Sequence, residues 1–348
     1  MKFEELVKSS GEWLRADGPE CGIVISSRVR LARNLFSFRF ESHISSEEKE
    51  NVADLVKEAV LSTSYARELC WFDLESLTEL ERHLLLERHL ISREQEESAG
   101  ARGVVVNEPE TLSIMVNEED HLRLQSLRSG LQLEDAYEQL SSIDDELAKK
   151  LDYAFDEEFG YLTACPTNVG TGMRVSVMVH LPALVMSGHI EKAFNAVHDL
   201  RLAVRGLYGE GTEAHGEFYQ ISNQITIGRS EEDILADLKA VIEGIVNYEK
   251  KARERLLGRE PMKLEDKVWR AYSTLKNARL ISSDETMRHL SSVRLGAQLG
   301  MLPELELKTL NTIFLYIQPA HLQKLEGKEL PPEERDVVRA RYIREHLS

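Results

Sequence analysis

The spacing of apolar residues changes near residue 258, and this change restricts the possible folds more than any other feature of the sequence. Before it, segments with strand-like alternation occur in pairs and clusters among helical segments, without the regular strand–helix alternation of a parallel sheet. After it, only helical spacing is found. We therefore expect an α+β fold, with an antiparallel sheet flanked by helices in residues 1–257 and an all-helical domain in residues 258–348.

The same spacing predicts the individual elements. Strands are expected at 21–27, 103–107, 111–117 and 174–181, and a hairpin at 217–228 that turns at Ser222–Asn223. Helices are expected at 46–70, 77–90, 119–152, 190–206, 230–257, 263–279, 283–299, 304–317 and 332–346. Ser282 and Glu285 predict a capping box. The apolar runs 290–302 and 310–317 could pack internally or form a dimer face.

Composition excludes several classes of protein. A net charge of −17 argues against a general nucleic-acid binder. The negative charge lies almost entirely in the first 257 residues, where it could attract a cationic partner or simply keep the protein soluble. No apolar run approaches the ~20 residues of a membrane span. Three cysteines, Cys21, Cys70 and Cys165, form no CxxC pair, so we expect a cytoplasmic protein without a disulfide framework or a zinc site.

Sequence motifs exclude the common phosphate-handling and hydrolytic enzymes. The chain has no GxxxxGK[ST] loop, no HRD or DFG segment, no HExxH and no GxSxG. It has instead arginines beside short polar turns, in four motifs: SSRVR (26–30), NEEDHLR (117–123), CPTNVGTGMR (165–174) and RGLYGEGTE (205–213). We expect NEEDHLR to lead from a strand into a helix.

Each of these motifs has an ordinary structural interpretation. Paired arginines on a strand end are usually surface salt-bridge donors, acids at a helix start are usually caps, and a buried cysteine usually behaves as a small apolar residue. Together, however, five arginines at element ends would form a basic pocket within an acidic domain. Such a pocket suits a triphosphate, because phosphoryl transfer depends mainly on charge neutralisation and alignment. Glu119 and Glu210 could then hold a cationic acceptor such as a guanidinium.

These four motifs resemble, in the same order, the active-site segments of the phosphagen (guanidino) kinases, over roughly residues 20–250. The resemblance implies phosphagen kinase roles for particular positions. It implies Glu119 and Glu210 as the carboxylates that hold the guanidinium and Cys165 as the neighbouring catalytic thiol. It assigns the nucleotide to Ser26, Ser27, Arg28, Arg30, His89, Arg123, Arg174, Ser176, Met178 and Arg205. Met178 departs from the family, which usually has histidine there, and this affects the adenine contacts.

Two larger departures point to one branch of that family. Phosphagen kinases carry a helical domain before SSRVR, whereas only about 25 residues precede it here, and a helical segment follows residue 258. This arrangement resembles the McsB-type protein arginine kinases of bacteria. Within the added segment, Arg335, Asp336 and Arg339 match the RDxxRA motif of that branch. The resemblance implies an allosteric phosphoarginine-binding site there, whereas composition alone would favour a solvated basic helix face.

The resemblance implies ATP-dependent phosphorylation of arginine side chains in proteins, in protein quality control or a stress response. Mg²⁺ is expected to arrive with ATP, without a dedicated protein metal site. Proteins with exposed arginine are the expected substrates, and an activator protein, a protease or chaperone system and a homodimer are the expected partners. Two alternatives remain at this point: a metabolic kinase for free arginine or another guanidino compound, and a non-enzymatic regulator that only binds phosphoarginine.

Overall fold

The main feature of the fold is one eight-stranded antiparallel sheet. The computed structural model describes residues 3–8, 11–206 and 215–347. In sheet order, the strands are β2 (Leu69–Asp73), β3 (Gly103–Asn107), β4 (Leu112–Val116), β5 (Leu122–Ser129), β1 (Val24–Arg33), β8 (Met173–His180), β10 (Phe218–Asn223) and β9 (Leu202–Gly206). A separate hairpin pairs β6 (Phe155–Asp156) with β7 (Gly160–Tyr161). The sheet confirms the expected α+β class.

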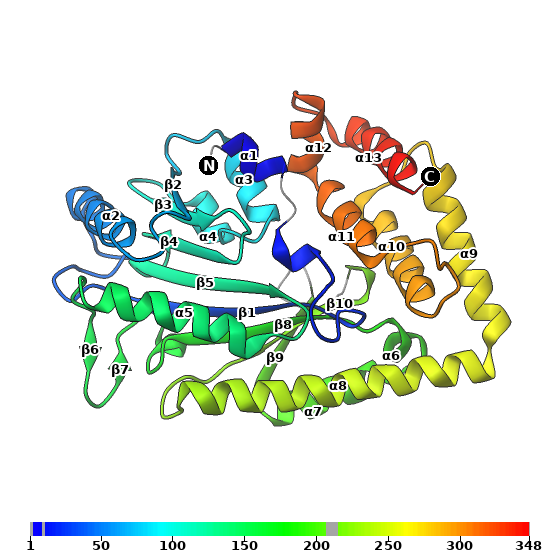
Figure 1. The fold of residues 1–348 in the computed structure, drawn as a ribbon, viewed down its shortest axis with the longest axis horizontal. Coiled ribbons are helices and arrows are strands. Elements are labelled where there is room, and N and C mark those ends of the chain that lie inside the picture. Colours follow the sequence, from blue (N-terminus) through cyan, green and yellow to red (C-terminus); the bar gives the residue numbers. More distant parts are fainter. Residues whose placement is uncertain (1–2, 9–10, 207–214, 348) are drawn as a thin grey trace.

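One face of the sheet is apolar and is covered by helices. Val175, Val177 and Val179 of β8 are fully buried on this face. The covering helices are α2 (Ser46–Leu61), α5 (Leu133–Ala148), α6 (Pro182–Met186), α7 (Ile190–Asp199) and α8 (Glu231–Arg259). In Figure 1, α5, α7 and α8 run beneath the sheet. The long α8 begins at the N-cap Ser230, whose hydroxyl accepts a hydrogen bond from the backbone NH of Asp233.

Two groups of helices cover the two ends of the opposite face, and they meet where Glu87 binds His321. At the β2–β4 end lie α1 (Phe3–Lys8), α3 (Glu79–Glu87) and α4 (Arg93–Glu97), and the first two contribute to an apolar cluster with β3. At the other end, Leu127, Met178 and Phe218 pack against the C-terminal helices. Figure 1 shows both groups above the sheet. The polar middle of this face therefore lies between them.

The C-terminal part of the chain is all-helical, as expected. Its helices are α9 (Pro261–Asn277), α10 (Ser283–Gln298), α11 (Leu307–Tyr316), α12 (Pro319–Glu326) and α13 (Pro332–His346). Ser282 is the N-cap of α10 and accepts a hydrogen bond from the NH of Glu285. The apolar runs 290–302 and 310–317 supply buried residues of the core of this helical part. Of the two expected alternatives, internal packing therefore describes these buried residues. The sequence analysis missed the short α12.

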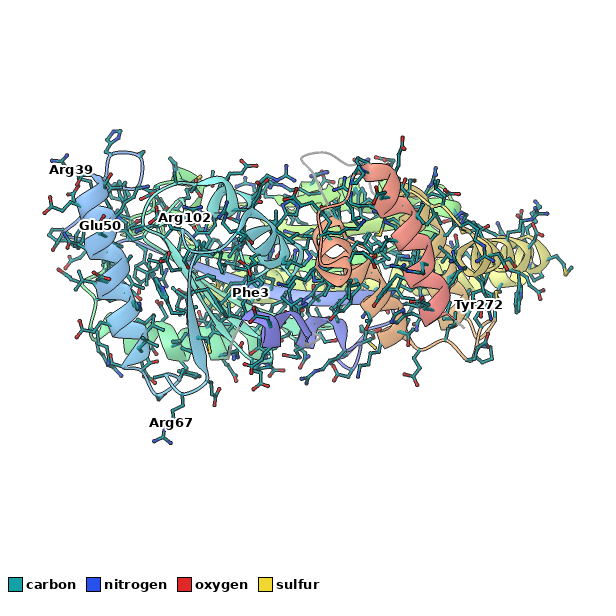
Figure 2. The ribbon with its side chains drawn as sticks, turned by 90° about the horizontal axis from the view of Figure 1, so that it is seen from above. Phe3, Arg39, Glu50, Arg67, Arg102 and Tyr272 are labelled. Atoms are coloured by element: carbon teal, nitrogen blue, oxygen red, sulfur yellow. The ribbon has the colours of Figure 1, made fainter. Side chains whose placement is uncertain are left out.

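The helical domain is packed directly against the sheet domain. Helix α8, expected at 230–257, ends at Arg259, two residues later. His180 Nε2 of β8 lies 2.8 Å from Ser291 Oγ of α10. Asn311 of α11 donates a 3.0 Å hydrogen bond to the carbonyl of Leu14 in the 3-10 helix η1 (Glu12–Leu14). In Figure 2, Arg39 lies at one end of the molecule and Tyr272 lies toward the other. The two domains thus form one continuous body along its long axis.

Four of the expected elements are wrong in part. The segment expected as a helix at 119–152 begins with β5, because alternate residues of LRLQSLRS face opposite sides of the sheet, and helix α5 follows only at Leu133. The expected helix at 46–70 ends at Leu61 and is followed by β2. Residues 202–206, expected to be helical, form β9. The expected hairpin at 217–228 is absent from this described segment, since β10 pairs with β8 and β9 instead.

Candidate active site

Strand register brings the five predicted arginines to one face of the sheet. Residues directly opposite each other in an antiparallel pair point to the same face. The pairs Arg28–Ser176, Arg30–Arg174 and Ala32–Arg123 join β1 to its two neighbours. Met178 pairs with Gln220 of β10, which in turn pairs with Arg205 of β9. Arg28, Arg30, Arg123, Arg174 and Arg205 therefore form one set, which we call the arginine face.

Most of these arginines lower one another's pKa. Burial first, then Arg174 and Arg123, lowers the pKa of Arg28 to about 10. Burial followed by the same kind of repulsion lowers the pKa of Arg30 well below its ordinary value. Burial, Arg205 and Arg123 also lower the pKa of Arg174, while Cys165 and Glu119 act in the opposite direction. Half-buried positive charges that repel one another are a favourable site for a polyanion.

The recorded hydrogen bonds of Arg28 and Arg174 go to neutral groups. Arg28 Nε donates to Ser176 Oγ at 3.2 Å, and its Nη2 donates to Gln220 Oε1 at 3.0 Å. Arg174 Nη2 lies 3.5 Å from Asn168 Oδ1. Neutral acceptors orient a guanidinium without cancelling its charge. These two arginines are thus positioned yet still positively charged. Asn168 belongs to the CPTNVGTGMR motif, although no role was expected for it, and Gln220 carries no motif signal of its own.

Arg123 lies in a different environment, among carboxylates. Its Nη1 donates to Glu118 at 2.7 Å and its Nη2 to Glu119 Oε2 at 2.6 Å, and Asp120 Oδ2 lies 3.5 Å away. Burial would lower the pKa of Arg123, but Glu118 and the other two acids outweigh burial and raise it. The Glu118 side chain is fully buried, whereas that of Glu119 is 38% exposed. Of these two carboxylates, Glu119 is the one that solvent or a ligand can reach.

A buried carboxylate connects the Glu119 turn to the Cys165 loop. Asp120 Oδ1 accepts hydrogen bonds from the NH of Ala164 at 2.8 Å and from Asn34 Nδ2 at 2.7 Å. Asn34 also donates to the carbonyl of Leu162 at 3.1 Å. Burial raises the pKa of Asp120. This network fixes the residue before Cys165 relative to Glu119. Sequence reasoning missed Asn34 altogether, and it treated Asp120 only as part of an acidic run.

Cys165 lies at the start of a short 3-10 turn, η2 (Pro166–Asn168). Its Sγ is 3.0 Å from Thr167 Oγ1, and the residue is partly exposed. The loop then returns to the sheet through Gly170, which forms a β-bridge with Tyr161. A partly exposed thiol thus stands beside the arginine face, on the loop that Asp120 holds.

The two adjacent serines of β1 lie on opposite faces of the sheet. Ser26 pairs with Met178 and Ser129 on the arginine face. Ser27 is fully buried on the other face, where its hydroxyl donates to the carbonyl of Gly130 at 2.8 Å and accepts from the NH of Gln132 at 3.0 Å. The expectation that the Ser27 side chain lines a phosphate site is therefore corrected, because strand alternation turns it away.

The other expected nucleotide residues lie at the rim of the arginine face. Met178 shares this face but is buried in the apolar cluster beneath the helical domain. His89 has a left-handed backbone, with φ of 61°, and its carbonyl accepts a 2.7 Å hydrogen bond from Gln125 Nε2. Burial, followed by repulsion from Arg28, lowers the pKa of His89 to about 4, so its ring is neutral at pH 7.

Arg205 is exposed on β9, and Glu210 lies outside the described residues.

In the helical domain, the three candidate residues do not share one environment. Arg339 is buried. Its Nε donates a hydrogen bond to the carbonyl of Ile317, and its Nη1 donates one to the carbonyl of Ile281, both at 3.1 Å. The same Nη1 also forms an ion pair with Asp336. Burial lowers its pKa. The alternative of a fully solvated basic face is therefore wrong for Arg339. Arg335 and Asp336 are partly exposed.

Comparison with known proteins identifies the family of the chain. The model of the ATP:guanido phosphotransferase C-terminal catalytic domain matches residues 51–252, and that of the protein-arginine kinase McsB C-terminal domain matches residues 261–348. A protein-arginine kinase of Symbiobacterium thermophilum is 47% identical over the whole of both chains. The chain belongs to the protein-arginine kinase family. A protein-arginine kinase of Geobacillus stearothermophilus is 48% identical, with 96% of this chain and 93% of that protein covered.

Solved structures extend this likeness to the fold of other guanidino kinases. A lombricine kinase aligns with a TM-score of 0.59 and 26% identity over 70% of each chain. A duplicated taurocyamine kinase of Schistosoma mansoni aligns with a TM-score of 0.62 over 80% of this chain and 41% of that one. At 24% identity, the second likeness concerns the fold alone. The chain thus shares its fold with the lombricine kinase and the taurocyamine kinase.

The described residues contain neither a metal-binding cluster nor a membrane-spanning helix. Among residues 3–8, 11–206 and 215–347, no three His, Cys, Asp or Glu side chains form a group that could hold a metal ion. Within the same residues, no helix has both the length and the apolar character needed to span a membrane.

Proposed function

We propose that this protein-arginine kinase transfers the γ-phosphoryl group of ATP to the guanidinium of arginine side chains in proteins. The observation that carries the proposal is the arginine face, with three half-buried positive charges next to an exposed carboxylate, Glu119, and a partly exposed thiol, Cys165. A triphosphate needs the charges, and a cationic acceptor needs the carboxylate. The family of the chain supports both halves of this assignment.

The arginine face would act on the nucleotide by neutralising charge. As the γ-phosphoryl group moves, negative charge spreads over its equatorial oxygens and the leaving oxygen of ADP. Arg28 and Arg174 are already positioned when the substrate arrives, so little reorganisation is needed during the reaction. Bound phosphate would also relieve the mutual repulsion that lowers their pKa values. Mg²⁺ would enter on the nucleotide, since this cation commonly retains waters and binds through substrate phosphates.

Glu119 would act on the acceptor. A new N–P bond forms as the bond between the γ-phosphorus and the bridging oxygen of ADP breaks, and the attacking nitrogen must lose one proton. Free guanidinium has a pKa above ~12, so the proton is expected to leave as the N–P bond forms. Glu119 is the proposed proton acceptor and Glu210 the proposed orienting partner. Cys165 would lie beside the bound guanidinium. Arg123 holds Glu119 in place.

Several biological roles belong to the same proposal. We propose that the kinase works in the cytoplasm as a homodimer, in protein quality control or a stress response. In that setting an activator protein would stimulate it, and a protease or chaperone system would receive its products. Arg335 and Asp336, with Arg339 as their structural support, are the proposed allosteric phosphoarginine site. The free cysteines agree with a reducing compartment.

The deciding experiment offers two acceptors in parallel. The purified kinase is incubated with Mg-ATP and an arginine-rich, lysine-free protein, or with free arginine, and acid-labile phosphate is located by mass spectrometry at neutral pH. Phosphoarginine in the protein alone is the expected result. Phosphate on free arginine alone would establish a metabolic guanidino kinase instead. Phosphate on neither acceptor, together with binding of phosphoarginine, would establish a non-enzymatic regulator.

A further inference from the structure

The β6–β7 hairpin exposes aromatic side chains close to the catalytic loop. Phe155 is 55% exposed and Phe159 is 47% exposed. Phe36, at 68%, lies on the adjoining segment, whose backbone NH donates a 2.9 Å hydrogen bond to the carbonyl of Asp152. Figure 1 shows this hairpin projecting from the end of the molecule opposite the helical domain. Neighbouring exposed aromatic residues of this kind commonly mark an interaction site.

A cavity of about 570 Å³ lies at the base of this hairpin. Its apolar wall consists of Leu151, Tyr153, Phe155 and Tyr161. The wall is held firmly, because the Tyr161 ring lies 3.5 Å from the guanidinium carbon of Arg33, and Arg33 pairs with Asp144 at 2.7 Å. A cavity of this size and character can accept one or two bulky apolar side chains.

The cavity is connected to the catalytic loop by a short, well-anchored segment. Tyr161 precedes Cys165 by four residues, which can span at most about 14 Å. Leu162 accepts a hydrogen bond from Asn34, and the NH of Ala164 donates to Asp120. The cavity lies on the α5 side of the sheet, because Arg33 and Asp144 hold its wall. A peptide that passes around the end of the strands with its arginine beside Cys165 could place a residue about four positions away in the cavity.

The charges at the hairpin tip fit an arginine-bearing segment. Asp156, Glu157 and Glu158 separate the two exposed phenylalanines. Asp152 and two lysines, Lys149 and Lys150, also line the cavity. Lys150 donates hydrogen bonds to the hydroxyl oxygen of Ser62 at 2.6 Å and to its carbonyl oxygen at 2.8 Å, which orient the ammonium without cancelling its charge. The surface thus combines an apolar hollow, a basic edge and an acidic hairpin tip. This combination complements a polypeptide that carries both an apolar side chain and an arginine.

We propose that this hairpin and its cavity bind a bulky apolar side chain of the protein substrate, about four residues from the arginine that is phosphorylated. The inference rests on the proposed function and adds a specificity site to it. Folded proteins bury most of their large apolar side chains. Such a site would therefore favour unfolded segments, in which an apolar residue and an arginine are exposed together.

The test compares two peptides and three forms of the full-length kinase. The peptides contain a single arginine and are otherwise polar, and one has leucine in place of serine four residues from the arginine on each side. The kinase is wild type, the double variant Phe155→Ser/Phe159→Ser, or the control Tyr248→Ser, which removes an aromatic residue that is 59% exposed on α8. Phosphoarginine formation gives kcat/KM for each of the six combinations.

We expect the wild type and the Tyr248→Ser control to favour the leucine peptide by about tenfold. The Phe155→Ser/Phe159→Ser variant is expected to lose this preference while keeping the wild-type rate on the serine peptide. Equal rates on both peptides in the wild type would overturn the proposal. An equal loss on both peptides in the double variant would also overturn it, because the hairpin would then only support the catalytic loop.

A binding measurement separates this inference from the proposed function. Fluorescence anisotropy without ATP compares both peptides in versions that carry lysine instead of arginine. Tighter binding of the leucine version to wild type, but not to the double variant, would support the docking site even if no peptide were phosphorylated. Indistinguishable binding would overturn it. A lower oligomeric mass of the double variant in light scattering would assign the hairpin to a contact between copies of the chain, and this too would overturn the proposal.

Discussion

The arginine face of the sheet and the RDVVRA segment of α13 both present arginines, but in opposite states. On the sheet, Arg28 and Arg174 contact neutral acceptors and are surrounded by other positive charges. In α13, Arg339 is satisfied by two backbone carbonyls and by Asp336. The sheet arginines retain charge for a ligand, whereas Arg339 holds segments of the domain together. The same residue type therefore serves binding or stability according to its partners.

The strongest test of the sheet site removes its acceptor carboxylate. Glu119→Gln keeps the shape of the side chain but cannot accept the proton, so we expect kcat to fall by about 10²–10⁴-fold. KM for ATP should change little, because the phosphate arginines remain. Steady-state kinetics measures both parameters, with the exposed Glu108→Gln as the matched control. Retained turnover in Glu119→Gln would remove this residue from the mechanism.

Replacing arginine by glutamine in each region distinguishes a binding role from a structural one. The first such substitution is at Arg174 on the sheet. Arg174→Gln should lower kcat by about 10²-fold, through loss of a positioned phosphate donor. Its free energy of unfolding should stay within about 0.5 kcal/mol of wild type, since repulsion from Arg205 and Arg123 is removed as well. Urea denaturation and kinetics on the same preparation test this. A large loss of stability with normal kinetics would make Arg174 a structural residue.

The same substitution in α13 should act in the opposite way. Arg339→Gln leaves the carbonyls of Ile281 and Ile317 and the Asp336 carboxylate without their donor. We expect the free energy of unfolding to fall by about 2–3 kcal/mol. Denaturation is measured beside Arg335→Gln, a partly exposed neighbour that should change stability little. If Arg339→Gln proved as stable as wild type, the assignment of a supporting role would be wrong.

The burial of His89, and then its repulsion by Arg28, should make stability depend on pH. Its folded-state pKa of about 4 lies below the ordinary value of 6.5, so the folded protein binds fewer protons between these values. The stability that His89 contributes is therefore present above pH 6.5 and is lost as the pH falls toward 4, by about 1–3 kcal/mol in total. Denaturation of wild type and His89→Gln at pH 7 and pH 5 isolates this contribution. Parallel losses in both proteins would contradict it.

The smallest expected effects are those of serine substitutions on the two faces of the sheet, measured as changes in stability and in KM for ATP. Ser27→Ala should cost about 1 kcal/mol of stability, because Gly130 and Gln132 lose their partner. It should leave KM for ATP unchanged. Ser176→Ala, which frees Arg28 on the arginine face, should instead raise KM for ATP. Equal effects of both substitutions on KM would place Ser27 in the nucleotide site after all.

Local sequence patterns predicted the arginine set better than the elements that carry it. Arg28 and Arg30 are two residues apart on a strand, so their shared face follows from alternation alone. The same rule separates Ser26 from Ser27, a consequence that the motif resemblance obscured. Arg123 was placed on a helix because three preceding acids resemble a helix start, whereas they form a turn into β5. Local pattern could not distinguish the two.

Other parts of the site depend on contacts between distant segments. Asn34 meets Asp120 and Leu162 only because the segment after β1 passes both. Arg339 is buried because α13 packs against residues near Ile281 and Ile317, which the sequence of α13 does not reveal. The cavity beside Phe155 and Tyr161 likewise exists only once the β6–β7 hairpin folds against the end of α5. Tertiary packing, which no motif encodes, decides these features.

The most direct test of the account is an experimental structure of the kinase with a non-hydrolysable Mg-ATP analogue and an arginine-containing peptide. We expect phosphate oxygens within hydrogen-bond distance of Arg28, Arg30 and Arg174, with the peptide guanidinium between Glu119 and Cys165. Phosphates bound elsewhere, or a guanidinium held away from Glu119, would contradict it.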